Sequence, residues 1–262
     1  MDRDELLLRG DLNYAEVLRE EARCGGGSVI EEDGIVVTLA GHPHPLVNSA
    51  LRMDHRIDAE TCVDRIVNFY VPRGQGCTVI LRAAVDDSDL GRAAAEAEMR
   101  EWGELPAMVT EAPLERPATT DDCRLSWVDA AQTAEDFHRV AAEAWQTYDI
   151  PPDATDYVFG SGRLLLLPHV QAVVAYTGDS PAAAAFVLMS HEIAGVYWVS
   201  TIPAARGRGL AAACTQAVTN RAFELGARAV CLQASPMGRS VYERLGFSTI
   251  GSYRLMIAFP QE

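Results

Sequence analysis

A glycine-rich turn joins an apolar strand to an alanine-rich helix at residues 199–211, in the sequence Val-Ser-Thr-Ile-Pro-Ala-Ala-Arg-Gly-Arg-Gly-Leu-Ala. The first N–H groups of a helix have no partner inside the helix, and the helix dipole adds partial positive charge there. Gly207 and Gly209 keep side chains away from these groups, and Arg206 and Arg208 add positive charge. The junction therefore predicts a phosphate-binding site where the helix begins.

The spacing of the turn limits which phosphate compounds can bind. A Walker A loop requires Gly-x-x-x-x-Gly-Lys-Ser/Thr, whereas all 22 basic residues of this chain are arginine. A nucleoside triphosphate site of that kind is therefore excluded. A dinucleotide-binding turn reads Gly-x-Gly-x-x-Gly, and Ala212 stands where its third glycine belongs, so that pattern is matched only in part.

Two segments resemble the GCN5-related N-acetyltransferases (GNAT). Arg206-x-x-Gly209-x-Ala211 is similar to that family's pyrophosphate loop, Gln/Arg-x-x-Gly-x-Gly/Ala. Residues 241–247, Val-Tyr-Glu-Arg-Leu-Gly-Phe, resemble the family's Leu-Tyr-x-x-Leu-Gly-Phe helix ending. The chain departs from many relatives at Ser235, where they carry asparagine, so its contact to the pantetheine arm of coenzyme A differs.

The resemblance implies acetyl-CoA as co-substrate, bound between the strand that ends at Thr201 and the strand that ends at Gln233. Tyr242 is implied to protonate the departing thiolate. The residues implied to bind the cofactor are Val199, Ser200, Thr201, Arg206, Gly207, Arg208, Gly209, Leu210, Ala211 and Ser235. No metal is implied, because the pair His42 and His44 has no cysteine or carboxylate neighbour at ligand spacing.

The predicted activity is N-acetylation by direct attack of an amine acceptor on the thioester. Such an amine must lose its ammonium proton, and the sequence leaves the general base open among His191, Glu192, Tyr197, Tyr148 and Asp149. Since no base stands out, the alternative is a non-catalytic acyl-CoA-binding sensor or scaffold. A different donor such as succinyl-CoA would need a cation near the acyl end, and the sequence identifies none.

Composition narrows the partners and the compartment. The net charge of −15 argues against nucleic acid and favours a small-molecule or peptide acceptor that bears an amine. No apolar run approaches the ~20 residues of a membrane helix, and the first five residues are acidic where a signal peptide is basic. The six cysteines form no Cys-x-x-Cys pair, as expected for free thiols in a reducing compartment. We expect a cytoplasmic monomer or homodimer.

The proline-bearing stretch 113–122 predicts a boundary between domains 1–119 and 120–262. The second domain is predicted to contain strands at 123–128, 170–176, 182–189, 193–202, 229–233 and 252–259, a helix at 133–145 and the helix after the glycine turn, which ends at Gly226. This alternation predicts an α/β (α+β) fold, with a mixed, mostly antiparallel sheet of the GNAT type flanked by helices.

The first domain shows a parallel order of elements. We expect helices at 13–23, 58–70 and 88–102, with Asp58 as the N-cap of the second and the last closed by Gly103, and strands at 29–30, 35–39, 49–53, 77–83 and 105–110. Its turn at 53–58 has no glycine and two aspartates, which would repel a pyrophosphate. Residues 1–119 carry a net charge of −11 and residues 120–262 only −4. The sequence therefore predicts two tandem GNAT-like domains, of which the first is degenerate and lacks a cofactor loop.

Overall fold

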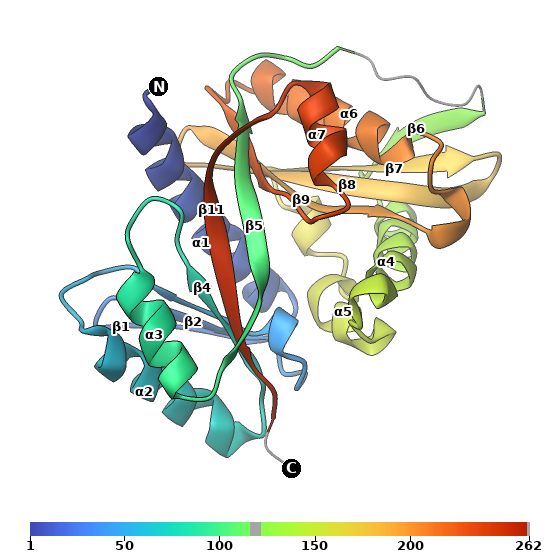
Figure 1. The fold of residues 1–262 in the computed structure, drawn as a ribbon. Helices are drawn as coiled ribbons and strands as arrows, with labels where there is room; N and C mark the ends of the chain where they lie inside the picture. The colour runs from blue at the N-terminus through green and yellow to red at the C-terminus, as the bar shows by residue number, and fades with distance from the viewer. Residues whose placement is uncertain (116–121, 261–262) are drawn as a thin grey trace.

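The computed structural model describes residues 1–115 and 122–260. Eleven strands in these residues form one continuous sheet, in the order β1-β2-β3-β4-β11-β5-β10-β9-β8-β7-β6. Among the strand pairs of this described part, only β3/β4 and β9/β10 are parallel. The prediction of a mixed, mostly antiparallel sheet is confirmed. Figure 1 shows two lobes joined by the long strands β5 and β11.

The first half begins with a long helix. Its elements are α1 (Arg3–Cys24), β1 (Ser28–Glu32), β2 (Ile35–Leu39), β3 (Ser49–Arg52), α2 (Ala59–Tyr70), β4 (Cys77–Leu81), α3 (Ser88–Glu96) and β5 (Arg100–Thr110), with 3-10 turns at Pro45–Val47 and Val71–Arg73. Helix α1 begins earlier than predicted, because Asp2 caps it by accepting a hydrogen bond from the Glu5 N–H at 2.8 Å. Asp58 caps α2 as predicted and accepts from the Thr61 N–H at 2.9 Å.

The second half follows the predicted order of strands and helices. Its elements are β6 (Cys123–Trp127), α4 (Ala131–Trp145), α5 (Pro152–Phe159), β7 (Val170–Thr177), β8 (Ser180–Ser190), β9 (Ile193–Thr201), α6 (Leu210–Glu224), β10 (Val230–Gln233), α7 (Arg239–Leu245) and β11 (Ser248–Ala258), with 3-10 turns at Gln146–Tyr148, Leu164–Leu166 and Pro203–Ala205. Helix α5 is an addition to the prediction. It has Pro152 at its first position, where a missing N–H costs nothing.

The final strands of the two halves are exchanged. Strand β11 lies between β4 and β5, with Leu255 opposite both Ile80 and Gly103. Strand β5 in turn pairs with β10, with Ala107 opposite Gln233. Each half therefore adds its last strand to the other half's sheet, and apart from the outermost strand β6 the sheet order is symmetric about β5 and β11. The predicted boundary between residues 119 and 120 lies outside the described residues.

The predicted helix 88–102, closed by Gly103, is wrong. Helix α3 ends at Glu96, and both Trp102 and Gly103 lie in β5. The chain leaves the helix in a Schellman turn, in which the Met99 N–H donates to the Ala94 carbonyl at 3.0 Å.

Glu98 occupies the left-handed position of this turn, with φ = 63°. Glycine is the residue expected there, so no local stop signal precedes Gly103. In the second half the same turn follows α7, where Gly246 has φ = 105° and the Phe247 N–H donates to the Tyr242 carbonyl at 3.0 Å. The position that matches Gly246 is therefore Glu98.

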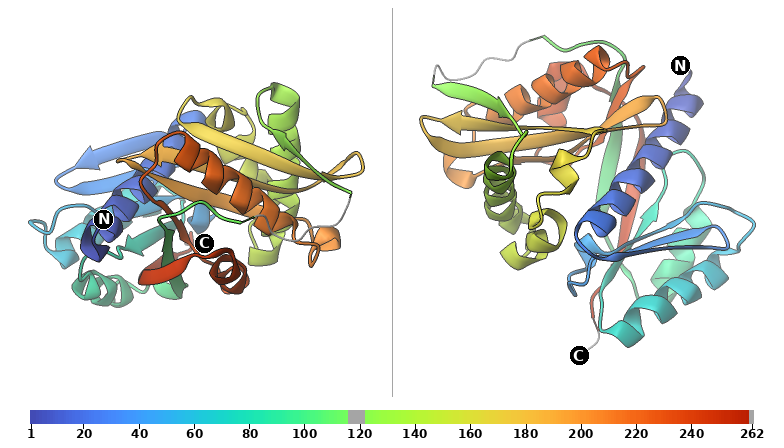
Figure 2. Two further views of the ribbon diagram at one scale, coloured as in Figure 1. Left: turned by 90° about the horizontal axis from the view of Figure 1, so that it is seen from above. Right: turned by 180° about the vertical axis from the view of Figure 1, so that it is seen from behind.

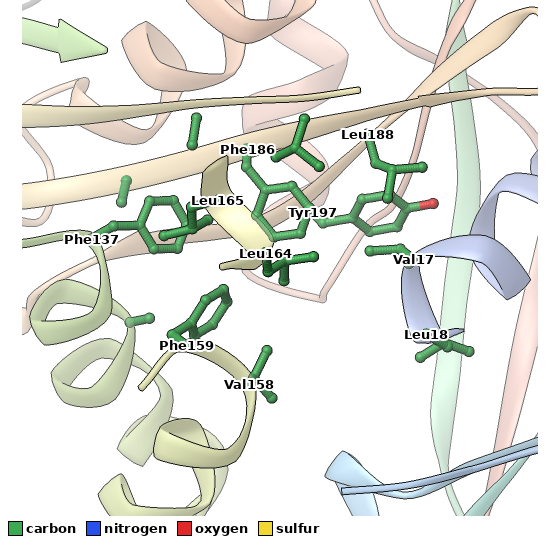
Figure 3. Close-up of a cluster of buried hydrophobic side chains, with 14 of the residues drawn as sticks. Val17, Leu18, Phe137, Val158, Phe159, Leu164, Leu165, Phe186, Leu188 and Tyr197 are labelled. Atoms are coloured by element: carbon green, nitrogen blue, oxygen red, sulfur yellow. The ribbon is translucent and has the colours of Figure 1, made fainter. Parts of the chain in front are cut away.

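Helices cover both faces of the second-half strands. Phe186 and Leu188 of β8 pack with α4, α5 and α1 on one face, whereas Val187 between them packs with α6 on the other, as strand alternation requires. Figure 2 shows α4 and α6 on opposite faces. In the cluster of Figure 3, Val17 and Leu18 of α1 join aromatic residues of the second half. Helix α1 thus belongs to the first half in sequence and to the second half's core in packing.

Candidate active site

The parallel strands β9 and β10 separate soon after they meet. Their paired positions are Ala194 with Val230 and Gly195 with Cys231, and β10 then continues along β5 instead. A bulge in β9 accompanies the separation: Trp198 has φ = 51°, and the register against β8 shifts between Ala184 and Phe186. The separation leaves the β9 edge that faces β10 without a strand partner from Val196 onward among the described residues, so its backbone groups are available to a ligand.

A cavity of about 1130 Å³ opens in this gap. All residues that the resemblance assigns to the site line it, namely Val199, Ser200, Thr201, Arg206, Gly207, Arg208, Gly209, Leu210, Ala211, Ser235 and Tyr242. The first half of the chain also contributes lining residues, including Thr110 and Leu114. The fold thus brings the predicted residues together from β9, α6 and the segment around α7.

The glycine turn has the backbone shape of an anion site. Gly207 and Gly209 have φ values of 78° and 76°, which side-chain-bearing residues rarely adopt. Gly209 is the N-cap of α6 and supplies no side-chain cap. Among the described residues, nothing accepts a hydrogen bond from the N–H groups of Leu210, Ala211 and Ala212. These donors line or border the cavity and are open to an external acceptor.

The two arginines of the turn are held by neighbouring segments. Arg206 donates to the Thr147 hydroxyl at 2.7 Å and to the Thr201 carbonyl at 3.4 Å. Arg208 forms an ion pair with Asp122 at 2.8 Å, with the arginine side chain 33% exposed. Both guanidinium groups stay at the mouth of the cavity, where they add positive potential.

Tyr242 stands where the large cavity meets a smaller one. It lies on α7, is buried, and lines both cavities. Burial, with the nearby Tyr148 as a second cause, raises the pKa of Tyr242 well above its usual value of 10. Its hydroxyl therefore keeps its proton at neutral pH and can donate it. Ser235 also lines both cavities, and its Oγ accepts a hydrogen bond from the Gly238 N–H at 3.2 Å.

The smaller cavity has a volume of about 180 Å³ and lies between the halves. Helix α1 and strands β4, β5 and β11 line it together with β9 and α4. Seven aromatic residues contribute to its wall: Tyr14, Trp102, Trp145, Tyr148, Tyr197, Trp198 and Tyr242. The bulge residue Trp198 packs against Trp145, with ring centroids 4.6 Å apart, and Ser200 accepts from Trp145 Nε1 at 2.8 Å and donates to the Trp198 carbonyl at 2.9 Å.

Glu21 is the acidic residue that lines this smaller cavity. Its Oε1 accepts a hydrogen bond from Trp198 Nε1 at 2.8 Å. Burial raises the pKa of the Glu21 carboxyl from about 4.5 to about 7, and the bond from Trp198 offsets part of that rise. The sequence reasoning missed Glu21, although a signal was present. Residues 14, 17, 18 and 21 share one helical face, so a carboxylate stands on the apolar side of α1.

The five base candidates from the sequence fall into different places. His191 and Glu192 form the turn between β8 and β9 and line neither cavity, and Glu192 pairs with Arg9 at 2.9 Å. Asp149 also lies outside both cavity walls.

Tyr197 and Tyr148 do reach a cavity. The Tyr197 hydroxyl donates to Asn13 Oδ1 at 2.6 Å, and burial raises its pKa far above 10, which makes it a poor base. Tyr148 lines both cavities.

Within residues 1–115 and 122–260, no group of three or more histidine, cysteine, aspartate or glutamate side chains is arranged to hold a metal ion. No helix in this part of the chain combines the length and apolar character needed to cross a membrane.

Comparison with known proteins finds one matching domain model and several similar folds. Residues 133–256 match the family model described as "Acetyltransferase (GNAT) domain". A comparison with curated protein sequences gives no match. Among solved structures, the chain is similar to a GCN5-related N-acetyltransferase from Kribbella flavida, with 18% identity, a TM-score of 0.72, and coverage of 98% of this chain and 96% of that one.

Two other solved structures share the fold. One is a GCN5-related N-acetyltransferase from Sphaerobacter thermophilus, with 15% identity, 87% and 78% of the two chains covered and a TM-score of 0.59. The other is a tandem GNAT protein from the clavulanic acid biosynthesis pathway, with 14% identity, 89% and 82% covered and a TM-score of 0.58. Residues 133–256 therefore match a GNAT acetyltransferase domain, and both predicted motifs lie inside the matched segment.

Proposed function

We propose that the protein is an acetyl-CoA-dependent N-acetyltransferase that acts by direct transfer to an amine. The observation that carries the proposal is the start of α6, where the open N–H groups of Leu210, Ala211 and Ala212 share a cavity with Tyr242. A surface helix start with the same sequence would need neither the separation of β9 from β10 nor a tyrosine at the inner end of the gap.

The proposed cofactor position follows from the donors. The diphosphate lies on the N–H groups of residues 207–211, where the α6 dipole favours negative charge. The pantetheine arm runs along the unpaired edge of β9 at residues 199–201, and its inner end passes Ser235. The cavity volume of about 1130 Å³ leaves room for a ligand of this size.

Acetyl-CoA supplies the acetyl group as a thioester. A backbone N–H at residues 199–201 stabilises the negative charge that develops on the carbonyl oxygen. The Tyr242 hydroxyl donates its proton to the departing sulfur while the amine nitrogen bonds to the acetyl carbon and the carbon–sulfur bond breaks. The raised pKa of Tyr242 suits a group that must be protonated before the reaction.

We also propose that the chain consists of two GNAT-like units, 1–119 and 120–262, of which the second holds the cofactor. Support comes from the sheet, in which β3 with β4 and β9 with β10 occupy corresponding places on either side of β5 and β11. Support also comes from the matching Schellman turns after α3 and α7.

A carboxylate placed in the turn tests the cofactor site. The Gly207 Cα faces open space, so Gly207→Glu adds a side chain without a clash. A charge near 4 Å from a phosphate costs about 4 kcal/mol close to a protein surface. We expect isothermal titration calorimetry to show acetyl-CoA affinity reduced at least ~100-fold.

Gly226→Glu is the matched control. Gly226 follows the other end of α6, has φ = 95°, and also faces open space. Both variants therefore carry a similar backbone strain and the same added charge. Equal acetyl-CoA affinity in the two variants would reject the cofactor site.

A non-catalytic acyl-CoA sensor is the alternative. Such a protein would bind acetyl-CoA in calorimetry and release no free thiol with any amine. A succinyl donor is disfavoured, because the described lining of the smaller cavity includes no arginine and does include Glu21, which would repel an acyl carboxylate. Thiol release measured over a panel of amines separates these cases.

A further inference from the structure

The smaller cavity is continuous in its lining with the proposed acetyl-CoA site. Trp145, Tyr148, Val199, Ser235 and Tyr242 line both cavities. A molecule in the smaller cavity therefore approaches the inner end of the large one, beside the Tyr242 hydroxyl. The far wall comes from α1, which belongs to the other half of the chain. The halves together enclose this space.

Glu21 is a carboxylate without a cationic partner. Its hydrogen bond comes from the neutral indole of Trp198, and among the described residues no arginine or histidine forms an ion pair with it. Other glutamates on the same helix do have such partners, since Glu16 pairs with Arg19 and Glu20 with Arg23. A partly buried carboxylate that lines a cavity is stabilised when a cation enters.

The groups that face Glu21 leave it as the charged centre of the cavity. Tyr14 on its own helix and Tyr197 on β9 are phenols whose pKa burial raises, so both are neutral near pH 7. Trp198 and Trp145 present indole rings. Aromatic rings attract a cation through their negative faces and provide an apolar wall for the rest of the molecule.

The size of the cavity limits the ligand. A volume of about 180 Å³ corresponds to roughly six water molecules at ~30 Å³ each. Leu18, Ile80, Leu105 and Leu255 add aliphatic surface. The cavity suits a small molecule with one cationic group and an apolar body.

We propose, on the basis of the acetyltransferase function above, that this cavity binds a small monocationic amine as the acceptor and that Glu21 is the general base that takes its proton. Glu21 first removes a proton from the ammonium group, which frees the nitrogen lone pair. The nitrogen bonds to the acetyl carbon, the carbon–sulfur bond breaks, and Tyr242 protonates the sulfur. The new amide loses its second proton to solvent, and solvent returns one to Tyr242 and removes one from Glu21, so that one proton is released per turnover.

The test compares Glu21→Gln with Glu20→Gln, which removes a neighbouring carboxylate that lines neither cavity. Three measurements are made on the full chain. They are acetyl-CoA affinity by calorimetry, benzylamine binding by quenching of tryptophan fluorescence, and kcat/KM against pH for a panel of small primary amines.

We expect Glu21→Gln to keep acetyl-CoA affinity, to weaken benzylamine binding, and to lower kcat/KM at least ~100-fold. The wild-type profile should rise with pH through an apparent pKa near 7, and the variant should lose that limb. Glu20→Gln should match the wild type, and benzyl alcohol should bind poorly to all three proteins.

Two results overturn the proposal: a Glu21→Gln variant with wild-type kcat/KM and pH profile, or a preference for anionic or uncharged acceptors. Failure of acetyl-CoA to bind the wild type would instead contradict the acetyltransferase function. Glu21-dependent binding of benzylamine would in that case still support the amine site, so the two failures are distinguishable.

Discussion

The two halves of the chain place a helix at the same point of the sheet but start it differently. Helix α2 follows β3, and its N-cap Asp58 accepts the Thr61 N–H at 2.9 Å. Helix α6 follows β9, and its N-cap Gly209 offers no side chain. The protein's own carboxylate occupies one helix start, whereas the first N–H groups of the other have no acceptor among the described residues.

The space beyond the parallel strands also differs between the halves, being filled in the first and open in the second. At the end of β3 the guanidinium of Arg52 is buried, pairing with Asp87 at 2.8 Å and Asp89 at 2.6 Å. At the end of β9, the corresponding region opens into the cavity that Tyr242 lines. The fold therefore supplies a gap between the strands in both halves. A few side chains determine whether an ion pair fills the gap or a cavity remains.

The largest expected effect comes from breaking the buried ion pair. Arg52→Met removes the guanidinium that lies 2.8 Å from Asp87 and leaves that buried carboxylate with His55 at 3.2 Å and Arg82 at 3.6 Å, so the loss of unfolding free energy should reach at most about 3–5 kcal/mol. Denaturant unfolding measures this loss. Arg56→Met is the control, because Arg56 is 92% exposed and its pair with Asp54 should contribute at most ~1 kcal/mol. Equal losses would show that the first-half gap is not held closed by Arg52.

The next largest change in unfolding free energy is expected at Glu21, which has no ion-pair partner among the described residues. The pKa of Glu21 rises from about 4.5 to about 7 on folding, so the folded state disfavours the charged carboxylate. Its penalty is absent at low pH and grows as pH rises from about 4.5 through 7. Glu21→Gln should therefore raise the unfolding free energy by about 1–2 kcal/mol at pH 8, and far less at pH 5.

Thermal and denaturant unfolding at the two pH values check this prediction, with Glu20→Gln as control. A variant whose stability gain is the same at pH 5 and pH 8 would contradict a raised pKa. A loss at pH 8 would mean that the folded protein stabilises the charged form of Glu21.

Local signals in the sequence predicted most elements and the residues around the glycine turn. The Asp58 cap and the strands of both halves depend on neighbours along the chain, and those predictions are confirmed. The exchange of β5 and β11 was not predictable in this way. An apolar alternating strand shows that it has a buried face, but it does not say which strand pairs with it.

Glu21 and Glu98 show two other limits. A glutamate on the apolar side of α1 was detectable as an anomaly, but its meaning depends on Trp198, which is far away in sequence. Glu98 carries no glycine signal for the left-handed turn that it occupies. In both cases tertiary contacts, rather than local preference, determine the outcome.

Removing the N-cap of α2 tests whether this cap or the buried ion pair keeps the first half from binding cofactor. Asp58→Ala leaves the Thr61 N–H without its acceptor and should cost about 1 kcal/mol of unfolding free energy. Because Arg52 still fills the gap, we expect calorimetry to give the same acetyl-CoA stoichiometry as the wild type. A second bound equivalent in the variant would mean that the carboxylate cap, and not the ion pair, keeps the first half from binding cofactor.

The smallest expected change in unfolding free energy comes from Glu98→Gly in the turn after α3, with Gly246→Ala in the matching turn after α7 as its comparison. Glu98 has φ = 63°, a conformation that costs a side-chain-bearing residue roughly 1 kcal/mol, whereas glycine adopts it freely but loses more entropy on folding. Glu98→Gly should therefore stabilise the protein by only ~0.5 kcal/mol. Gly246→Ala should destabilise it by about 1–2 kcal/mol, since φ = 105° lies outside the usual left-handed region and the added Cβ meets only Leu114 at 3.9 Å. Opposite signs in denaturant unfolding would show that a positive φ limits the choice of residue at both positions. A destabilised Glu98→Gly would instead show that the Glu98 side chain makes a stabilising contribution that glycine lacks.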